Sequence, residues 1–233
     1  AYATAMVAAA SLPAALTLLN RLQQATGGMV EAFEYMPRTY LERMRLQMPE
    51  LTPPLGFDQD TTILVELGAT APRDCDPDDT GAVPLTGLLE DTLGALIGEG
   101  LATDAVIAQS HGQRLEMWKM RESAAEITMG RTPVIDNDVA VPLDRVAEFL
   151  DTAHQRLKAI DPDADTITVC HLGDGNLHFT VWPALDDDQI GDRIREMIED
   201  ITLELGGSFS AEHGIGLSKL ESMARRKDPV ALT

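Results

Sequence analysis

Two histidines enclose a glycine-rich segment that predicts a tight hairpin. His171 and His178 bound the sequence HLGDGNLH, and β-branched, apolar stretches at 166–170 and 177–182 flank it. Asp-Gly between two such stretches is the strongest short-range hairpin signal. If the turn closes at Asp174–Gly175, the two imidazoles fall on facing strands and can converge on one ion. Taken alone, the pair is more simply an ordinary hairpin with polar flanks.

A second cluster of chemically competent residues lies in SAEHGIG, where Glu212 and His213 are adjacent. Two hairpin imidazoles and the Glu212 carboxylate would suit a divalent transition metal with open coordination positions. Neighbouring side chains on an extended chain point in opposite directions, so His213 could stay free as an acid or base. The simpler interpretation is a helix N-terminal turn with a charged cap. Only five histidines occur in the chain, and three lie in these two segments, which favours a site.

Other residues give weaker signals. Arg121, in MWKMRES, could anchor a carboxylate, although a solvated helix charge is the simpler interpretation. Cys170 alternates with its neighbour His171, so we expect it to face the other side of the sheet as a small buried residue. The sequence has no G-x-G-x-x-G after a strand, no P-loop and no nucleophile elbow, and therefore indicates no nucleotide site of its own.

The elements that must position these residues alternate between strands and helices. Apolar β-branched runs predict strands at 2–10, 29–36, 61–69, 104–110, 131–142, 166–170 and 177–182, and a further short strand is expected at the start of SFSAEHGIG. Helical spacing and capping residues predict helices at 11–28, 37–47, 85–101, 112–128, 143–160 and 186–207, with another after the SAEHGIG turn. With a hairpin in its middle and no visible internal repeat, this pattern predicts an α+β fold. We expect one antiparallel or mixed sheet with helices packed mainly on one face.

Composition excludes several classes of function. The chain has 18 basic and 38 acidic residues among 233, a formal charge of −20, and is 44% hydrophobic. This content supports a sizeable core, while the charge argues against nucleic acid and anionic membrane surfaces as partners. No apolar run is long enough to span a membrane, and the two cysteines form no disulfide framework. With no signal peptide at the N-terminus, these features predict a cytoplasmic protein.

The two motifs together resemble the C-terminal, substrate-side domain of the FAD-linked oxidases, flavoenzymes that oxidise 2-hydroxy acids such as D-lactate, glycolate or D-2-hydroxyglutarate. VELGA, WKMRES and DVAVPLDRVAEFL support the resemblance in the same order, over about 65–222. It implies a ferredoxin-like α+β domain with an enlarged sheet. It also implies that 1–233 is one piece of a longer protein, whose N-terminal FAD-binding domain and extreme C-terminus lie outside it.

The resemblance further implies a role for individual residues. A divalent metal, Zn, Mn or Fe, would be held by His171, His178 and Glu212. His213 would take the hydroxyl proton, Arg121 would grip the substrate carboxylate, and Asn176 would contact the substrate. Hydride would pass to FAD, which the separate N-terminal domain would bind, and the reduced flavin would then pass its electrons to a downstream electron acceptor. The resemblance assigns no residue of this chain to FAD binding. Without the flavin domain, the isolated chain should not catalyse the oxidation. The chain could also form a homo-oligomer.

One position departs from the family pattern. Many relatives carry a Lys before the DVAVP strand, where this chain has Asp136. A second carboxylate clamp would then be lost, and a substrate with a neutral or basic far end becomes compatible. Two alternatives remain at this point. The same scaffold could oxidise a different alcohol or a phenol without metal, or the domain could be a non-enzymatic metal-binding or interaction module.

Overall fold

The computed structural model describes residues 1–79, 81–215 and 219–226. They form one seven-stranded, fully antiparallel sheet in the order β4-β1-β3-β2-β6-β7-β5. The N-terminal part contains β1 (Tyr2–Ala9), α1 (Leu12–Thr26), β2 (Val30–Pro37), α2 (Arg38–Gln47), β3 (Thr61–Gly68), α3 (Pro72–Cys75), α4 (Pro84–Gly98), β4 (Ala102–Ile107), α5 (His111–Glu122) and α6 (Ala124–Met129). The C-terminal part contains β5 (Ile135–Ala140), the 3-10 helix η1 (Leu143–Arg145), α7 (Val146–Ile160), β6 (Asp165–His171), β7 (Asn176–Trp182), α8 (Asp188–Glu204) and α9 (Leu220–Arg226).

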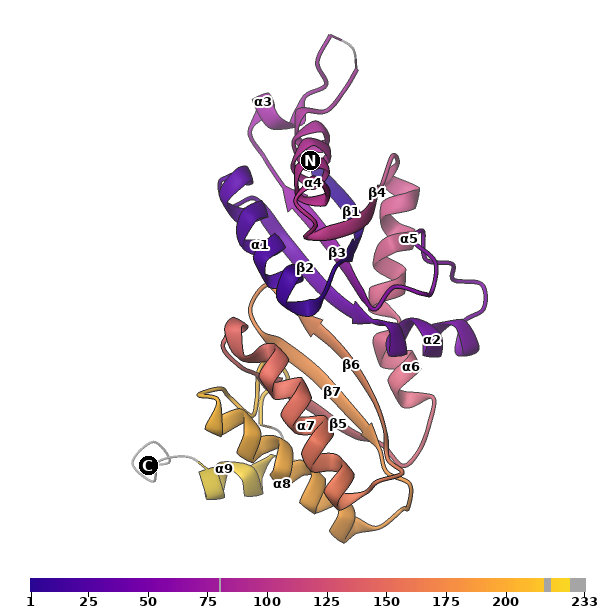
Figure 1. The fold of residues 1–233 in the computed structure, drawn as a ribbon, viewed down its shortest axis with the longest axis vertical. Coiled ribbons are helices and arrows are strands. Elements are labelled where there is room, and N and C mark those ends of the chain that lie inside the picture. Colours follow the sequence, from indigo (N-terminus) through magenta and orange to yellow (C-terminus); the bar gives the residue numbers. More distant parts are fainter. Residues whose placement is uncertain (80, 216–218, 227–233) are drawn as a thin grey trace.

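The sheet consists of two units with the same connectivity (Figure 1). In the first unit, β1, α1, β2, β3, α4 and β4 follow one another, and the strands lie in the order β4-β1-β3-β2. In the second unit, β5, α7, β6, β7 and α8 follow one another, and Ser208 then bridges to Ala140 at the outer edge of β5. Each unit is a ferredoxin-like split βαβ arrangement. The expected α+β fold is confirmed, and it contains a repeat of topology that the sequence does not reveal.

The two units meet along a short seam. β2 and β6 pair over only two register positions, Glu34 with His171 and Tyr35 with Cys170. By contrast, β6 and β7 pair over seven. The first of the hairpin histidines therefore lies at the junction of the two halves.

Helices cover both faces of the sheet. α1, α4, α7 and α8 bury the larger apolar cluster on one face, which includes Cys170 as expected. A smaller, methionine-rich cluster on the opposite face joins α2, α5 and α6 to the strands. The predicted helix 112–128 is interrupted at Ser123, whose hydroxyl donates to the carbonyl of Lys119 and competes with the helical backbone. Arg121 therefore lies in the last turn of α5.

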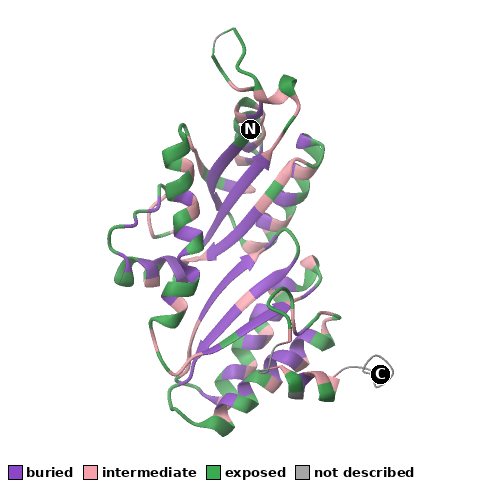
Figure 2. Cartoon of the chain, turned by 180° about the vertical axis from the view of Figure 1, so that it is seen from behind, coloured by how far each residue is buried: buried purple, intermediate pink, exposed green. Residues whose placement is uncertain are grey.

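Burial follows this layered arrangement. The central strands are largely buried, whereas the edge strand β4 is mostly exposed or half-buried; most other exposed residues lie on the outer sides of the helices and in loops (Figure 2). Within the described part of the chain, no helix has both the length and the apolar character needed to cross a bilayer.

Candidate active site

The β6–β7 hairpin brings the two histidines together through a register that differs from the predicted one. The connection is the four-residue loop 172–175, rather than a two-residue turn, because the N–H groups of Asp174 and Gly175 both donate to the carbonyl of His171. His171 consequently pairs with Asn176, and His178 with Val169. The shift is two residues, so both imidazoles stay on one face as diagonal neighbours. Their ring centroids are 5.3 Å apart.

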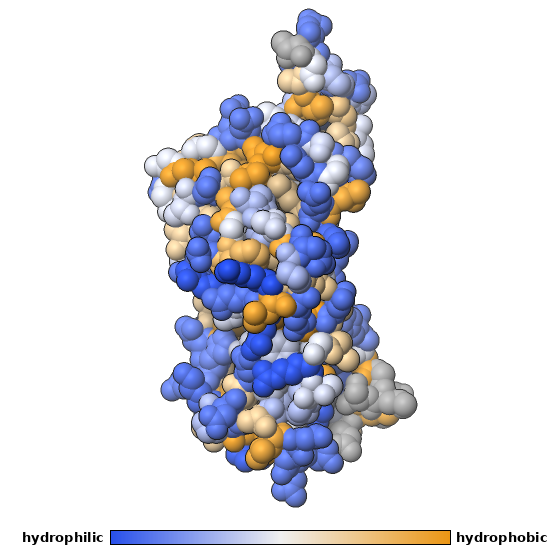
Figure 3. Space-filling model, turned by 90° about the vertical axis from the view of Figure 1, so that its right-hand side faces the viewer, coloured by the Kyte–Doolittle hydropathy of each residue, from blue (hydrophilic) through white to orange (hydrophobic). Residues whose placement is uncertain are grey.

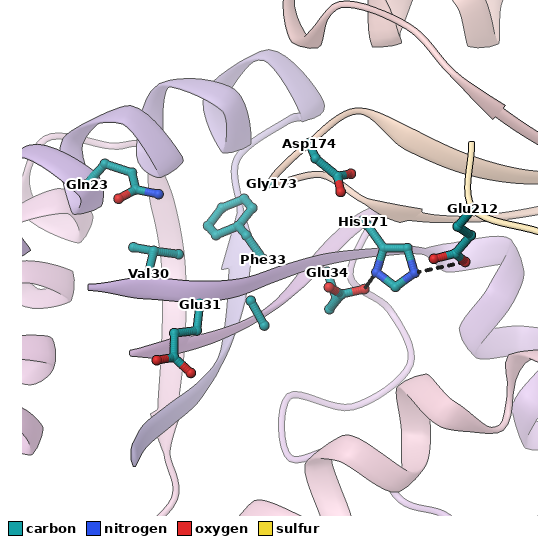
Figure 4. Close-up of a pocket in the computed structure, with 10 residues that line it drawn as sticks. Gln23, Val30, Glu31, Phe33, Glu34, His171, Gly173, Asp174 and Glu212 are labelled. Carbon is teal, nitrogen blue, oxygen red and sulfur yellow. Dashed lines mark ion pairs between the residues drawn. The ribbon is translucent and has the colours of Figure 1, made fainter. Parts of the chain in front are cut away.

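A buried carboxylate on β2 orients His171. Nδ1 of His171 lies 2.8 Å from Oε2 of Glu34, and Nε of Arg121 donates to the same oxygen at 2.9 Å. Figure 4 shows the imidazole of His171 between the carboxylates of Glu34 and Glu212. The bond to Glu34 places the proton of a neutral His171 on Nδ1, which leaves Nε2 facing Glu212 and 3.3 Å from Nη2 of Arg121.

The segment that follows Ser208 supplies Glu212 and His213. Asp138 on β5 holds it, because one oxygen of its buried carboxylate accepts the backbone N–H of Glu212 at 3.1 Å and of His213 at 2.9 Å. Lys219 lies 3.5 Å from the same oxygen. The segment is not extended here, so the two side chains do not diverge as predicted: Nε2 of His213 lies 3.4 Å from Oε1 of Glu212. The ring of His213 stacks on that of His178 at 5.4 Å.

Two overlapping sets of side chains could hold a metal ion. His171, His178 and Glu212 form one set, and Asp138, His178 and His213 form the other; within each, one ligand atom per residue lies within 4.8 Å of the others. Oε1 of Glu212 is 3.2 Å from Nε2 of His178 and 3.7 Å from Nε2 of His171. Glu212 is half-exposed, whereas Asp138 already accepts two N–H bonds and contacts a lysine. The first set is therefore freer to bind an ion.

The surroundings of His171 and His178 shift the pKa values of the two imidazoles in opposite directions. Burial lowers the pKa of His178, and the neighbouring Arg121 and His171 lower it further. The hydrogen bond to Glu34 raises the pKa of His171. For Asp138, burial favours a higher pKa, but the backbone N–H bonds from His213 and Glu212 outweigh it, and the pKa is lowered. His178 is thus held as a neutral imidazole and Asp138 as an anion near neutral pH, the states these groups need as a metal ligand and as a loop anchor.

Two cavities meet at this cluster. The first, about 340 Å³, lies beside β2 and is lined by Val30, Phe33, Glu34 and the hairpin loop. The second, about 260 Å³, extends over β7 and β5 and is lined by Arg121, Asp136, His178 and His213, among others. We call them the β2 cavity and the β5 cavity. His171 and Glu212 line both cavities and form the wall between them.

Comparison with known proteins gives the family. The chain matches the family described as FAD linked oxidases, C-terminal domain, over residues 1–233. The chain belongs to this family. Among curated proteins, it is 26% identical to the mitochondrial D-2-hydroxyglutarate dehydrogenase of Arabidopsis thaliana, over 91% of the chain and 36% of that protein. It is 29% identical to the D-lactate dehydrogenase of Anaerostipes hadrus, over 58% of the chain and 29% of that protein.

The FAD-linked oxidase domain thus spans about a third of the length of such relatives. Solved structures share its fold at much lower identity. An alkyldihydroxyacetonephosphate synthase aligns over 96% of the chain and 42% of its own, with a TM-score of 0.55 and 12% identity. A p-cresol methylhydroxylase aligns over 90% of the chain and 45% of its own, with a TM-score of 0.54 and 9% identity.

The predicted site residues of this FAD-linked oxidase domain do not all converge. The described structure brings His171, His178, Glu212, His213 and Arg121 to the β5 cavity. Arg121 is buried and ion-paired, not a solvated helix charge.

Asn176 is the exception. It lies on the same face of β7, but it lines neither of the two cavities, and its Oδ1 is buried without a partner among the described residues. A substrate contact by Asn176 stays a prediction, as do the metal-binding and proton-accepting roles.

Sequence reasoning missed Glu34 and Asp138, the two carboxylates that orient the site. Glu34 lies within the largely apolar stretch AFEYM, and Asp138 directly precedes the apolar stretch VAVP, and both carboxylates are buried. Charge at a buried strand position is rare unless the group is paired, and this was the available signal.

Proposed function

We propose that this chain is the substrate-side domain of a flavin-dependent dehydrogenase that oxidises a 2-hydroxy acid. The convergence of His171, His178 and Glu212 beside a buried arginine carries the proposal. Two further findings support the proposal: the chain belongs to the FAD-linked oxidase family, and it is similar to proteins named as D-2-hydroxyglutarate and D-lactate dehydrogenases.

The residues present fit a divalent transition metal. Two imidazoles and one carboxylate are a donor set found in metal sites with open coordination positions, and suit Zn, Mn or Fe. His171 has the carboxylate partner on its second nitrogen that ligand histidines usually have, in Glu34. The lowered pKa of His178 favours the neutral imidazole that binds metals.

Different residues of the chain would bind the carboxylate of a 2-hydroxy acid and accept its hydroxyl proton. Arg121 has its Nε bonded to Glu34 and would bind the substrate carboxylate through its terminal nitrogens. His213, more than half exposed beside Glu212, would accept the hydroxyl proton. When bound, the metal supplies positive charge beside the hydroxyl oxygen, and the flavin of the separate domain supplies the hydride acceptor.

Metal titration of the chain tests the ligand set. We expect Zn²⁺ or Mn²⁺ to bind at one site per chain, measured by calorimetry. His171→Ala and Glu212→Gln should each weaken binding by at least about tenfold, because each removes a ligand. His213→Ala should leave it nearly unchanged. The reverse pattern, with His213→Ala losing metal and His171→Ala keeping it, would assign the ion to Asp138, His178 and His213.

Turnover tests the reaction in the flavin-containing protein that carries this chain. We expect bleaching of the flavin by one or more 2-hydroxy acids, and a decrease in kcat of about 10²–10⁴ for His213→Ala. His111→Ala is the matched control, because His111 is exposed at the start of α5 and lines neither the β2 nor the β5 cavity. Full activity after metal removal would favour oxidation of another alcohol without metal. Metal binding without any bleaching would favour a binding module.

A further inference from the structure

Asp136 and Arg121 both line the β5 cavity, Asp136 from the edge strand β5 and Arg121 from α5. Glu34 on β2, His171 on β6, His178 on β7 and Asp136 on β5 occupy one face of four consecutive strands. Asp136 pairs with Thr180, two residues beyond His178 on β7, so Asp136 is a diagonal neighbour of His178, and β5 lies about 10 Å across the sheet from β6. Arg121 contacts Glu34 and His171 above the seam between β2 and β6, and His178 lies between this arginine and Asp136.

The described lining of the β5 cavity has one permanently cationic side chain. Arg121 is the only Lys or Arg among the described residues that line it, and its Nε is already committed to Glu34. Asp136 and Glu122 also line the cavity.

Asp136 keeps a free acceptor for a ligand. Its Oδ1 accepts the hydroxyl of Thr180 at 2.8 Å, which fixes the carboxylate on the sheet. The residue is exposed, and no described residue donates a hydrogen bond to its other oxygen. The oxygen can therefore accept from a donor group inside the cavity, and would repel an anionic one.

We propose that Asp136 determines the substrate class: a 2-hydroxy acid with a single carboxylate, whose far end is a hydrogen-bond donor rather than a second carboxylate. The inference rests on the function proposed above. A substrate with its carboxylate on Arg121 and its hydroxyl beside His178 and Glu212 directs its far end toward Asp136. A dicarboxylic hydroxy acid would place its second negative charge beside Asp136, where the described lining residues include no lysine or arginine to compensate.

A matched pair of substrates tests this in the flavin-containing protein that carries the chain. 2-Hydroxyglutarate and its 5-amide differ only at the far end, which is an anionic carboxylate in the first and a neutral amide with hydrogen-bond donors in the second. We expect the wild type to have a higher kcat/KM for the amide. Asp136→Asn, which retains an acceptor for Thr180, should shift the ratio toward the dicarboxylate by about 10- to 100-fold, mainly through KM. Asp136→Lys should shift it further in the same direction.

Asp104→Asn is the matched control. Asp104 is an exposed aspartate on β4, the edge strand at the opposite end of the sheet, and its substitution should leave the ratio unchanged. A wild-type preference for the dicarboxylate would overturn the inference while the proposed function stands, and so would an unchanged ratio in both Asp136 variants. A protein whose flavin is reduced by no 2-hydroxy acid would overturn both.

Discussion

At the scale of single residues, Glu34 connects the proposed metal site with the proposed site for the substrate carboxylate. One of its oxygens contacts both His171, a candidate metal ligand, and Arg121, the candidate carboxylate anchor. A neutral amide at this position would bond Nδ1 of His171 more weakly and leave Arg121 without its counter-ion. We therefore expect Glu34→Gln to weaken Zn²⁺ binding by about 10- to 100-fold, measured by calorimetry on the chain.

Glu31→Gln is the control for this prediction. Glu31 lies on the same strand and lines the same β2 cavity, but its side chain points away from His171 (Figure 4). It should bind Zn²⁺ like the wild type. Equal affinities in the two variants, with both folded by circular dichroism, would show that the carboxylate of Glu34 does not orient the ligand.

At the scale of elements, Gly175 sets the hairpin loop that aligns the histidines. Its φ is +80°, and a Cβ at this position would lie 2.1 Å from the carbonyl oxygen of Val141. This carbonyl belongs to the backbone beside β5, so moving it away from an added Cβ would distort the sheet. We expect Gly175→Ala to lower the free energy of unfolding by at least about 2 kcal/mol, measured by urea denaturation.

Gly173, two residues earlier in the same loop, provides the comparison. It has no positive φ, and an added Cβ would meet only the Cβ of Phe33, at 4.0 Å. Gly173→Ala should change the free energy of unfolding by less than about 0.5 kcal/mol. If the two variants were equally stable, the loop would be able to adopt another conformation.

Glu66 makes a second element-scale contact, between β3 and α5. Its buried carboxylate accepts bonds from Arg114, Thr4 and Trp118. Burial favours a higher pKa, but these bonds prevail and lower it from 4.5. Since the pKa is lower in the folded state than in the unfolded chain, the stabilisation is complete above about 4.5 and is lost as the pH falls through the folded value.

Glu66→Gln should therefore lower the free energy of unfolding by about 2–3 kcal/mol at neutral pH. The difference from the wild type should shrink as the pH falls below 4.5, which urea denaturation at several pH values would measure. Glu148→Gln, which removes an exposed ion pair with Arg145, should cost less than about 1 kcal/mol. A constant difference at every pH would mean that Glu66 contributes through packing rather than through its charge.

At the scale of the whole molecule, the charge of −20 opposes compaction. One side of the surface shows apolar side chains in small separate groups among charged and polar ones (Figure 3). Raising NaCl from about 0.01 M to about 1 M shortens the Debye length from about 30 to about 3 Å and screens the repulsion. We expect this to stabilise the fold at pH 7 by about 1 kcal/mol, an increase in Tm of about 2–4 °C.

The same salt series at pH 4.4 is the control, because the net charge is close to zero there. The increase in Tm should nearly disappear at that pH. A decrease in Tm with salt at pH 7 would show that local ion pairs such as Arg21 with Glu99 outweigh the net repulsion.

Local patterns in the amino-acid sequence predict the secondary-structure elements and most of the candidate site residues. Strand and helix periodicity is local, so all seven strands and the long helices could be predicted. The further short strand expected at the start of SFSAEHGIG is only an isolated bridge at Ser208. The two glycine-rich motifs likewise identified His171, His178, Glu212 and His213, because few histidines occur elsewhere.

The arrangement of these elements, the hairpin register and the partners of the buried carboxylates depend on tertiary contacts. The twofold repeat of the split βαβ unit lies in topology, and its two copies need share only their hydrophobic periodicity. Hydrogen bonds within 172–175 fixed the hairpin register. Glu34 and Arg121 are 87 residues apart, and Asp138 and His213 are 75 apart. Pairing over such separations depends on the packing of the whole sheet, which is why no local pattern could assign these carboxylates their partners.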